Sequence, residues 1–275
     1  MKKTLAMMTA AMMVAGALAG CGSSSSTPAA TTAAATTAAA TEAATTEAAG
    51  DTTAAAEGTV KTPSGKFTVG FDQEFPPMGF VGDDGEFTGF DLDLAKEVAS
   101  RLGLEFVPQP INWDAKDMEL ESGNIDCIWN GFTMQGREDA YTWVGPYMAN
   151  NQVFVVNADS DIASKADLAG KAVEVQKDSS GLAALQDDAE LSASFGSMTE
   201  VADYNTALMD LESGACDAVC MDSIVAGYQI KSSGKDMKIL DDTLSAEEYG
   251  IGFKKGEDEL AKAVYDTLME MKDDG

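Results

Sequence analysis

The chain has 275 residues, a hydrophobic fraction of 45% and a formal net charge of −28, so it has room for one large or two small domains with packed cores. The acidic balance repels phosphate backbones and argues against nucleic acid as a partner. Histidine is absent, which removes the usual general base and the commonest metal ligand, so catalysis is less expected and no metal or other cofactor is predicted.

The first twenty residues have the features of a secretory signal. The basic start MKK precedes the apolar run TLAMMTAAMMVAGA, which is too short to span a bilayer as a permanent helix. Leu18–Cys21 then resembles a bacterial lipobox, in which cleavage leaves a lipidated Cys21 at the new N-terminus. Residues 1–20 are therefore predicted to be a lipoprotein signal peptide. The alternative is an ordinary signal peptide followed by an incidental cysteine.

Residues 21–60 form a low-complexity tract of serine, alanine and threonine with a few acidic residues. This composition offers almost nothing to bury, so the tract is predicted to be a disordered linker behind the lipidated Cys21. The other three cysteines are Cys127, Cys216 and Cys220. If the run CDAVC is a strand, Cys216 and Cys220 lie too far apart along it for a disulfide. All three cysteines are predicted to be buried small hydrophobic residues rather than parts of a disulfide or a metal site.

From Lys66 onward the sequence alternates between strand and helix patterns. In chain order, strands are predicted at 66–71, 104–109, 125–129, 151–156, 171–176, 217–221, 237–241 and 247–255, and helices at 89–103, 114–123, 180–188, 204–214, 222–232 and 258–274. Such alternation predicts an α/β fold with largely parallel sheets covered by helices on both faces. Because the cycle restarts after Asp161, two lobes are expected.

Arginine occurs only twice, at Arg101 and Arg137. Arg101 lies on a predicted amphipathic helix, whereas Arg137 follows a predicted strand in the loop NGFTMQGRED. Parallel α/β sheets bind ligands beyond the carboxyl ends of their strands, and the other post-strand segments, FDQEFPP, NWDA, QKDSSG and MDS, add acids, aromatics and serines. A surface bridge to Glu138 or Asp139 is the simpler role for Arg137. Lysine would serve there equally well, so the planar fork of arginine favours a carboxylate ligand.

Residues 66–272 resemble the family 3 extracellular solute-binding proteins, the polar amino-acid receptors of ABC importers. The resemblance rests on an ordered set of segments, chiefly GFDQEFPPMGFVGDDGEFTGFDLDLAKEVASRLG, YTWVGPYMANNQVFVV, LESGACDAVCMD and EEYGIGFKKG. It implies a two-lobed periplasmic-binding-protein-like fold of type II, with residues 61–152 plus 250–275 in lobe 1 and residues 153–249 in lobe 2. The hinge crossovers would lie near Gln152–Val156 and Tyr249–Phe253.

The resemblance also implies a ligand site. Arg137 would bind the carboxylate of an amino acid with Thr133 as hydroxyl partner, and the Gly131 carbonyl and Asp222 would receive the ammonium group. The remaining implied ligand-binding residues are Phe75 and Trp113 as an aromatic clamp, Ser179 and Ser180 from the second lobe, and Asp72 and Gln176 facing the ligand side chain, with Glu74 and Asn130 as further candidates.

Each of these residues also has a simpler structural role that the sequence leaves open. Asp222 and the two serines are placed to cap helices, Phe75 and Trp113 could be core aromatics, and Asp72 is one acid among many. The chain also departs from many relatives at two points. The loop before Arg137 is one residue shorter, with Gly136 in the gap, and the chain stops at KDDG where relatives add a further helix.

The prediction is therefore an extracytoplasmic, lipid-anchored, monomeric binding protein that captures a polar or cationic amino acid for an ABC transporter permease, without catalysis. One rival is a cyclohexadienyl-dehydratase-like enzyme on the same fold, with Glu74 or Asp72 as the general acid. A sensory ectodomain is another, and it would need a second membrane segment and an output domain. The sequence does not identify the amino acid.

Overall fold

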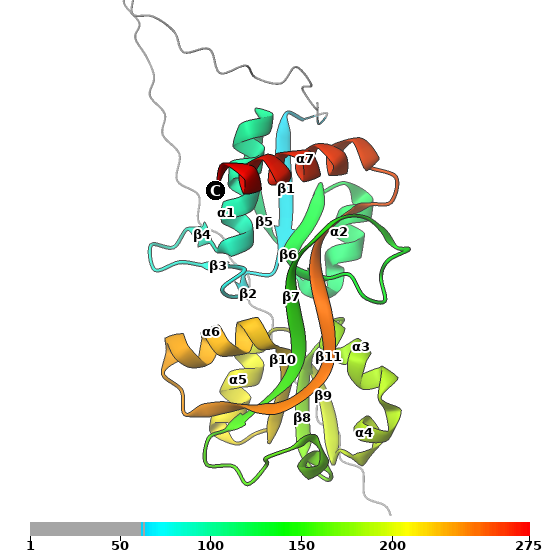
Figure 1. Ribbon diagram of the computed structural model, residues 1–275. Helices are drawn as coiled ribbons and strands as arrows, with labels where there is room; N and C mark the ends of the chain where they lie inside the picture. Colours follow the sequence, from blue (N-terminus) through cyan, green and yellow to red (C-terminus); the bar gives the residue numbers. More distant parts are fainter. Residues whose placement is uncertain (1–61, 63) are drawn as a thin grey trace, which may run out of the picture. The chain divides into compact units, whose positions relative to one another are not determined.

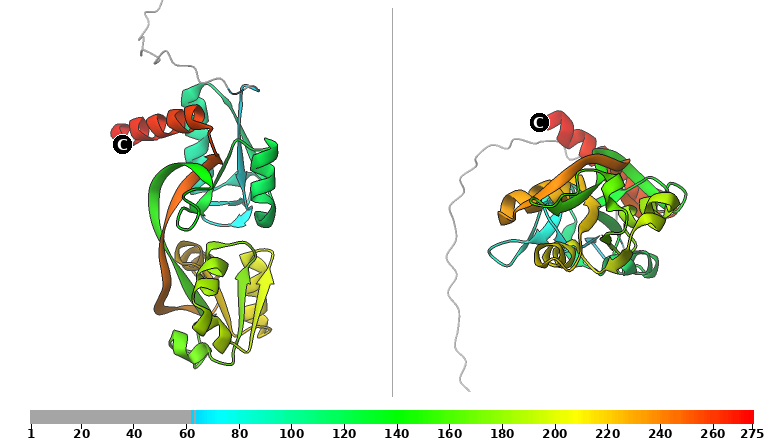
Figure 2. Two further views of the ribbon diagram at one scale, coloured as in Figure 1. Left: turned by 90° about the vertical axis from the view of Figure 1, so that its right-hand side faces the viewer. Right: turned by 90° about the horizontal axis from the view of Figure 1, so that it is seen from below.

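The computed structural model describes residue 62 and residues 64–275. The predicted signal peptide, Cys21 and the linker assigned to residues 21–60 lie outside the described residues. In the described part, two lobes are joined by two long strands (Figure 1). The same two strands run along one side of the described part in the left view of Figure 2.

One eight-stranded sheet, in the order β5-β1-β6-β11-β7-β10-β8-β9, passes through both lobes. In lobe 1, β1 (Lys66–Phe71) pairs in parallel with β5 (Glu105–Pro110) and β6 (Cys127–Thr133). In lobe 2, β8 (Ala172–Gln176) pairs in parallel with β9 (Ser197–Val201) and β10 (Ala218–Asp222). The predicted α/β fold with parallel strands in each lobe is therefore confirmed, and the type II binding-protein architecture with it.

The strands that join the lobes are β7 (Tyr141–Asn157) and β11 (Met237–Lys254), which pair with each other antiparallel. Tyr249–Phe253 of β11 also pairs with β6, and Gln152–Val155 of β7 pairs with β10. Each segment expected as a crossover thus belongs to one lobe, and the chain passes between lobes a few residues earlier in both strands. The positions predicted for the crossovers were wrong because sheet pairing, which the sequence does not display, determines where each lobe ends.

Helices cover both faces of each half of the sheet. Lobe 1 contains α1 (Phe90–Leu102), the short η1 (Trp113–Ala115), α2 (Lys116–Ser122) and α7 (Asp258–Asp274), and lobe 2 contains η2 (Lys165–Leu168), α3 (Ser180–Asp187), α4 (Ala189–Ser194), α5 (Tyr204–Ser213) and α6 (Ser223–Ser233). Gly103 ends α1 in the left-handed conformation with φ 69°, as its position predicted. The α1 and α7 helices lie beside each other in Figure 1 and bury Val98 and Val264 in one core.

A small separate sheet was not predicted. It consists of β2 (Glu74–Phe75), β3 (Gly79–Val81) and β4 (Phe87–Thr88). Its first strand carries Phe75 toward lobe 2, where Phe75 and Met78 pack in the same apolar cluster as Tyr204. The small sheet therefore contributes to the contact between the lobes.

The cysteines and the helices bear on the remaining structural predictions. Cys127, Cys216 and Cys220 are buried free thiols, as predicted. None of the helices formed by residues 64–275 has the length and apolar content needed to cross a bilayer. Within the same residues, no group of three or more Cys, Asp and Glu side chains has the arrangement of a metal site.

Candidate functional site

A small cavity lies between the two lobes. It is lined by Phe75, Trp113, Gly131, Thr133, Arg137, Gln176, Ser179, Ser180 and Asp222. These are nine of the ten ligand-binding residues that the family resemblance implied. The tenth, Asp72, accepts a hydrogen bond from Gln176 at the edge of the cavity. The carboxyl ends of β6, β8 and β10 all meet there, which is where parallel sheets bind ligands.

Arg137 reaches the cavity from a tight turn at the end of β6. The turn is closed by a 3.0 Å hydrogen bond from the Arg137 N–H to the Met134 carbonyl, and Gly136 has φ 78°, a conformation that favours glycine. The guanidinium carbon of Arg137 lies 5.1 Å from the centre of the Phe132 ring. Gly136 thus lets this tight turn place the guanidinium at the cavity.

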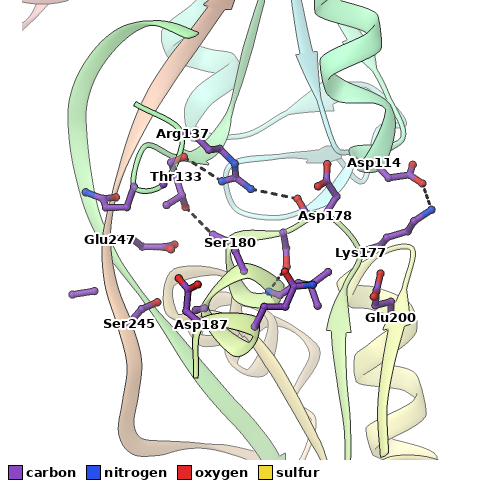
Figure 3. A pocket seen from close by; sticks show the side chains of 18 residues that line it. Asp114, Thr133, Arg137, Lys177, Asp178, Ser180, Asp187, Glu200, Ser245 and Glu247 are labelled. Carbon is purple, nitrogen blue, oxygen red and sulfur yellow. Dashed lines mark hydrogen bonds and ion pairs between the residues drawn. The ribbon is translucent and has the colours of Figure 1, made fainter. Parts of the chain in front are cut away.

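Within residues 64–275, the hydrogen-bond acceptors of the Arg137 guanidinium are all backbone carbonyls. It donates to the carbonyls of Thr133 and Asp178 at 3.2 and 3.4 Å (Figure 3). No ion pair within residues 64–275 involves Arg137, so the alternative bridge to Glu138 or Asp139 is not formed. Arg101, by contrast, pairs with Glu97 and Asp274 at the surface.

The N-terminus of α3 faces Arg137 from the other lobe. Ser179 caps the helix, accepting a 3.0 Å hydrogen bond from the Leu182 N–H. The Ser180 hydroxyl accepts from Thr133 at 3.1 Å (Figure 3) and from the Gln152 amide at 3.1 Å. Backbone N–H groups at a helix N-terminus favour anions. The capping role left open for Ser179 therefore exists alongside its place in the cavity wall.

Asp222 is buried at the opposite side of the cavity. It occupies the N-cap position of α6, but its side chain makes no capping hydrogen bond. Its Oδ1 instead accepts from Asn150 Nδ2 at 2.7 Å and from the Tyr249 hydroxyl at 2.6 Å. Burial, followed by the charge of Glu247, raises the pKa of Asp222 to about 8. A cation placed beside Asp222 would favour the ionised form of this buried carboxyl group.

Position 131 requires glycine, both for its backbone conformation and because there is no room for a side chain. Its φ is 56°, and a Cβ at this position would lie 2.9 Å from the Phe75 ring. The Gly131 N–H donates to Asp91 Oδ2 at 2.6 Å, which also accepts from the Tyr147 hydroxyl at 2.8 Å. Burial raises the pKa of Asp91 to about 7. Asp91 was not singled out in the sequence, although acids are favoured in the first turn of a helix.

The two aromatic residues of the predicted clamp lie on different walls. Phe75 packs on Tyr204 with ring centres 5.9 Å apart, and Trp113 makes an edge contact with Phe132 at 5.6 Å. The Lys116 ammonium lies 5.3 Å from the centre of the Trp113 ring. Both aromatics are thus part of an apolar cluster and also face the cavity, so the two roles considered from the sequence coexist.

Asp72 faces a second, larger cavity that shares Trp113 with the first. Its Oδ2 accepts from Gln176 at 2.7 Å and its Oδ1 accepts from the Glu74 N–H at 2.9 Å. Burial raises the pKa of Asp72 to about 6, so it is mostly charged at pH 7.5. Glu74 lies beside it and accepts a hydrogen bond from Asn205 of lobe 2. The side-chain oxygen of Asn130, Oδ1, accepts a hydrogen bond from the Asp72 N–H at 3.0 Å.

Polar contacts hold the lobes together around the site. The Lys116 ammonium is 1% exposed and pairs with Asp178, whose φ is 56°. Lys177 pairs with Asp114 at 2.6 Å on the exposed rim (Figure 3). Neither pair could be predicted, because the partners lie about sixty positions apart and the chain is rich in acids.

Comparison with known proteins identifies the family of this chain. Residues 67–275 match the bacterial extracellular solute-binding proteins, family 3, and the chain belongs to this family. The L-cystine-binding protein TcyJ of Escherichia coli is 30% identical over 217 residues, which cover 77% of this chain and 79% of that protein. The arginine-binding extracellular protein ArtP of Bacillus subtilis is 30% identical over 231 residues, covering 81% and 88%.

A solved structure also shares the fold. It is that of an ABC uptake transporter substrate-binding protein from Streptococcus pneumoniae with bound histidine, and it is 33% identical to this chain. The TM-score is 0.75, over 78% of this chain and 89% of the other. These relatives are binding proteins.

The Lys116–Asp178 pair gives a testable prediction about how the lobes hold together. Asp178→Asn keeps a residue that tolerates positive φ but leaves the buried Lys116 ammonium without a counter-charge. Isothermal titration calorimetry should show amino-acid affinity reduced about tenfold, equivalent to about 1.4 kcal/mol. Lys177→Gln removes the neighbouring exposed pair and is the matched control, with an expected loss below about threefold. Equal losses in the two variants would contradict the role assigned to Lys116.

Proposed function

We propose that this protein is the extracytoplasmic substrate-binding component of an ABC importer and captures a polar or cationic L-amino acid between its two lobes. The observation that carries the proposal is the opposition of two charged groups across one cavity. Among the described residues, the Arg137 guanidinium from lobe 1 hydrogen-bonds only to carbonyl oxygens, and the buried Asp222 from lobe 2 accepts hydrogen bonds and pairs with no cation. A free amino acid carries the two complementary charges at the spacing of one carbon atom.

The assignment of the two poles follows from their surroundings. The carboxylate would lie between Arg137 and the N-terminus of α3, where a bidentate contact and backbone N–H groups both favour an anion. The ammonium group would lie between Asp222 and the Gly131 carbonyl. Phe75 and Trp113 would enclose the aliphatic part of the ligand.

The side chain of the ligand would point toward Asp72 and Gln176. An acid and an amide at this end of the cavity suit a side chain that ends in hydrogen-bond donors, whereas an aliphatic ligand would bring no further donor to the buried Asp72 carboxylate, which accepts from Gln176 and the Glu74 N–H. The relatives bind cystine or arginine by name, and the solved relative holds histidine, which is consistent with a polar or cationic ligand here.

The proposal extends to location and partners. The lipobox at Leu18–Cys21 would anchor the protein through Cys21 to the outer face of the cell membrane, and residues 22–60 would let the folded part move on its tether. The protein would act as a monomer and deliver its ligand to the membrane permease of the importer. Among the predicted rivals, the enzyme is the closest, but the binding proteins found as relatives favour capture without catalysis.

Substitutions at Arg137 and Asp222 test the groups proposed to bind the ligand carboxylate and ammonium. Arg137→Lys and Asp222→Asn should each weaken amino-acid binding by about 2–5 kcal/mol, because a ligand charge would be left poorly paired in a buried site. A thermal-shift panel of the twenty amino acids plus cystine identifies the ligand, and calorimetry measures the loss. Arg101→Lys replaces the only other arginine and should bind like the wild type. Affinities within about threefold of the wild type for both site variants would rule out this assignment.

Asp72 tests the side-chain preference. At pH 7.5, a polar or cationic amino acid should bind at least about tenfold tighter than leucine or glutamate, because the first satisfies the Asp72 carboxylate and glutamate is repelled by it. Asp72→Asn should narrow this ratio, whereas Asp83→Asn, at an exposed loop position of the same lobe, should leave it unchanged. Tight binding of glutamate or leucine that does not respond to Asp72→Asn would show that the ligand side chain points elsewhere.

Cys21 tests the anchor. Cys21→Ser should release the protein from washed membranes into the soluble fraction without changing amino-acid affinity, since the residues that line the candidate site are Phe75 and residues further along the chain. Ser26→Ala, a few residues further along, should remain in the membrane fraction. A Cys21→Ser protein that stays in the membranes would contradict the lipobox.

A further inference from the structure

A second acid lies beside Asp222 where the chain crosses between the lobes. Glu247 on β11 is opposite Asn150 on β7 in the strand register, and it is 5% exposed. Its Oε1 accepts hydrogen bonds from Asn150 Nδ2 at 2.6 Å and from Gln152 Nε2 at 2.9 Å. The same Asn150 nitrogen donates to Asp222 Oδ1 at 2.7 Å. One amide group therefore draws two buried carboxylates together.

The orientation of this amide is fixed by its other end. The Asn150 carbonyl oxygen accepts from the Ser223 hydroxyl at 3.0 Å and from the Ile224 N–H at 3.3 Å, at the start of α6. A reversed amide would lose these donors and present an oxygen to two acids. The Asn150 NH₂ group must therefore face Asp222 and Glu247.

No cation pairs with the two acids in the part of the chain that the structure describes. The titratable groups that face them are Tyr204 from α5, Tyr249 from β11 and Cys220 from β10, with Tyr147 behind Tyr249. Glu247 also borders an outer cavity whose other charged lining residues are Arg137, Lys177, Asp114, Asp178, Asp187 and Glu200. Two adjacent carboxylates without a counter-charge cannot both be ionised at low energy away from water.

We propose that Asp222 and Glu247 share a single proton, and that the ammonium group of the bound amino acid displaces this proton into solvent. The inference rests on the proposed function, because it assigns the ammonium group to Asp222. Before binding, the pair carries one negative charge. After binding, two carboxylates face one ammonium, so the buried group again carries one net negative charge. Binding thus places a cation in the site without changing its net charge.

The pH dependence follows from the proton count. Burial and the charge of Glu247 raise the pKa of Asp222 in the ligand-free protein, so the proton is held there at neutral pH and must leave when the ligand binds. Protons then compete with the ligand at low pH. Affinity should rise as the pH increases from 6 toward 8, by up to about tenfold per pH unit for one released proton.

The shared proton is tested without any ligand by carboxyl-carbon NMR of protein labelled at aspartate. The Asp222 signal, assigned by its loss in Asp222→Asn, should report a protonated carboxyl group at pH 6 in the wild type. It should titrate at clearly lower pH in Glu247→Gln, where the charge of the neighbour is gone. Glu248→Gln is the matched control, since Glu248 is exposed and adjacent, and it should behave like the wild type. A fully ionised Asp222 at pH 6, or a titration unaffected by Glu247→Gln, would overturn the proposal.

Calorimetry at pH 7, in phosphate and in Tris, tests the displacement with the amino acid or cystine that stabilises the protein most in the thermal-shift panel. The wild type and Glu248→Gln should release close to one proton per ligand, and their affinity should rise severalfold from pH 6 to pH 7. Glu247→Gln should release markedly fewer protons per ligand, and its affinity should change less than about twofold from pH 6 to pH 7. Binding without proton release in the wild type would overturn the inference while leaving the proposed function intact. If no panel member binds, the proposed function fails and the displacement step with it.

Discussion

The antiparallel pairing of β7 with β11 continues from one lobe into the other, with Tyr141 opposite Lys254 at one end and Asn157 opposite Met237 at the other. Because the parallel strands of each lobe attach to this pair, their carboxyl ends meet in the same space between the lobes (Figure 1). The loops after β6, β8 and β10 therefore supply one cavity from both sides. The pairing also brings Asn150 and Glu247 together where the chain passes between the lobes, so the polar groups that surround Asp222 come from the hinge itself.

The sequence predicted the parts of the fold that local pattern determines. The apolar face of α1, its glycine cap at Gly103 and the apolar runs of β1 and β6 are all visible in single segments. The edge strand β9 was missed because its residues, SMTEV, are mostly exposed and polar. The long strands β7 and β11 were recognised only over their apolar stretches, because the residues that cross between the lobes alternate less clearly between apolar and polar.

The residues around the candidate site were only partly inferred from the sequence. The scarcity of arginine drew attention to Arg137, and the ordered motifs of the family carried the others, which the structure places around one cavity. Lys116, Asp178, Asn150 and Glu247 gave no such signal. Their importance depends on contacts between distant segments, and in a chain with 46 acidic residues no single glutamate is distinctive. Burial, which only the folded structure reveals, is what separates Glu247 from the exposed Glu248 beside it.

The charges on the two lobes explain why a ligand would favour the closed arrangement. An exposed pair that joins the lobes without a ligand, Lys177–Asp114, contributes at most about 1 kcal/mol. Closure also brings Arg137 from lobe 1 and Asp222 from lobe 2 to one narrow cavity, each without a counter-charge among the described residues. This desolvation opposes closure of the free protein.

In the proposed binding mode, an amino acid would reverse that balance, because its two charged groups would pair with Arg137 and Asp222 at once and both pairs would be complete only when the lobes meet. Its affinity for the closed form would then exceed its affinity for an open form, which is the requirement for a ligand to shift a conformational equilibrium. A shift from 1:99 to 99:1 needs a preference of about 10⁴-fold, or about 5.5 kcal/mol. In this binding mode, both ligand charges would gain partners only in the closed arrangement, which is the kind of differential interaction that such a shift requires.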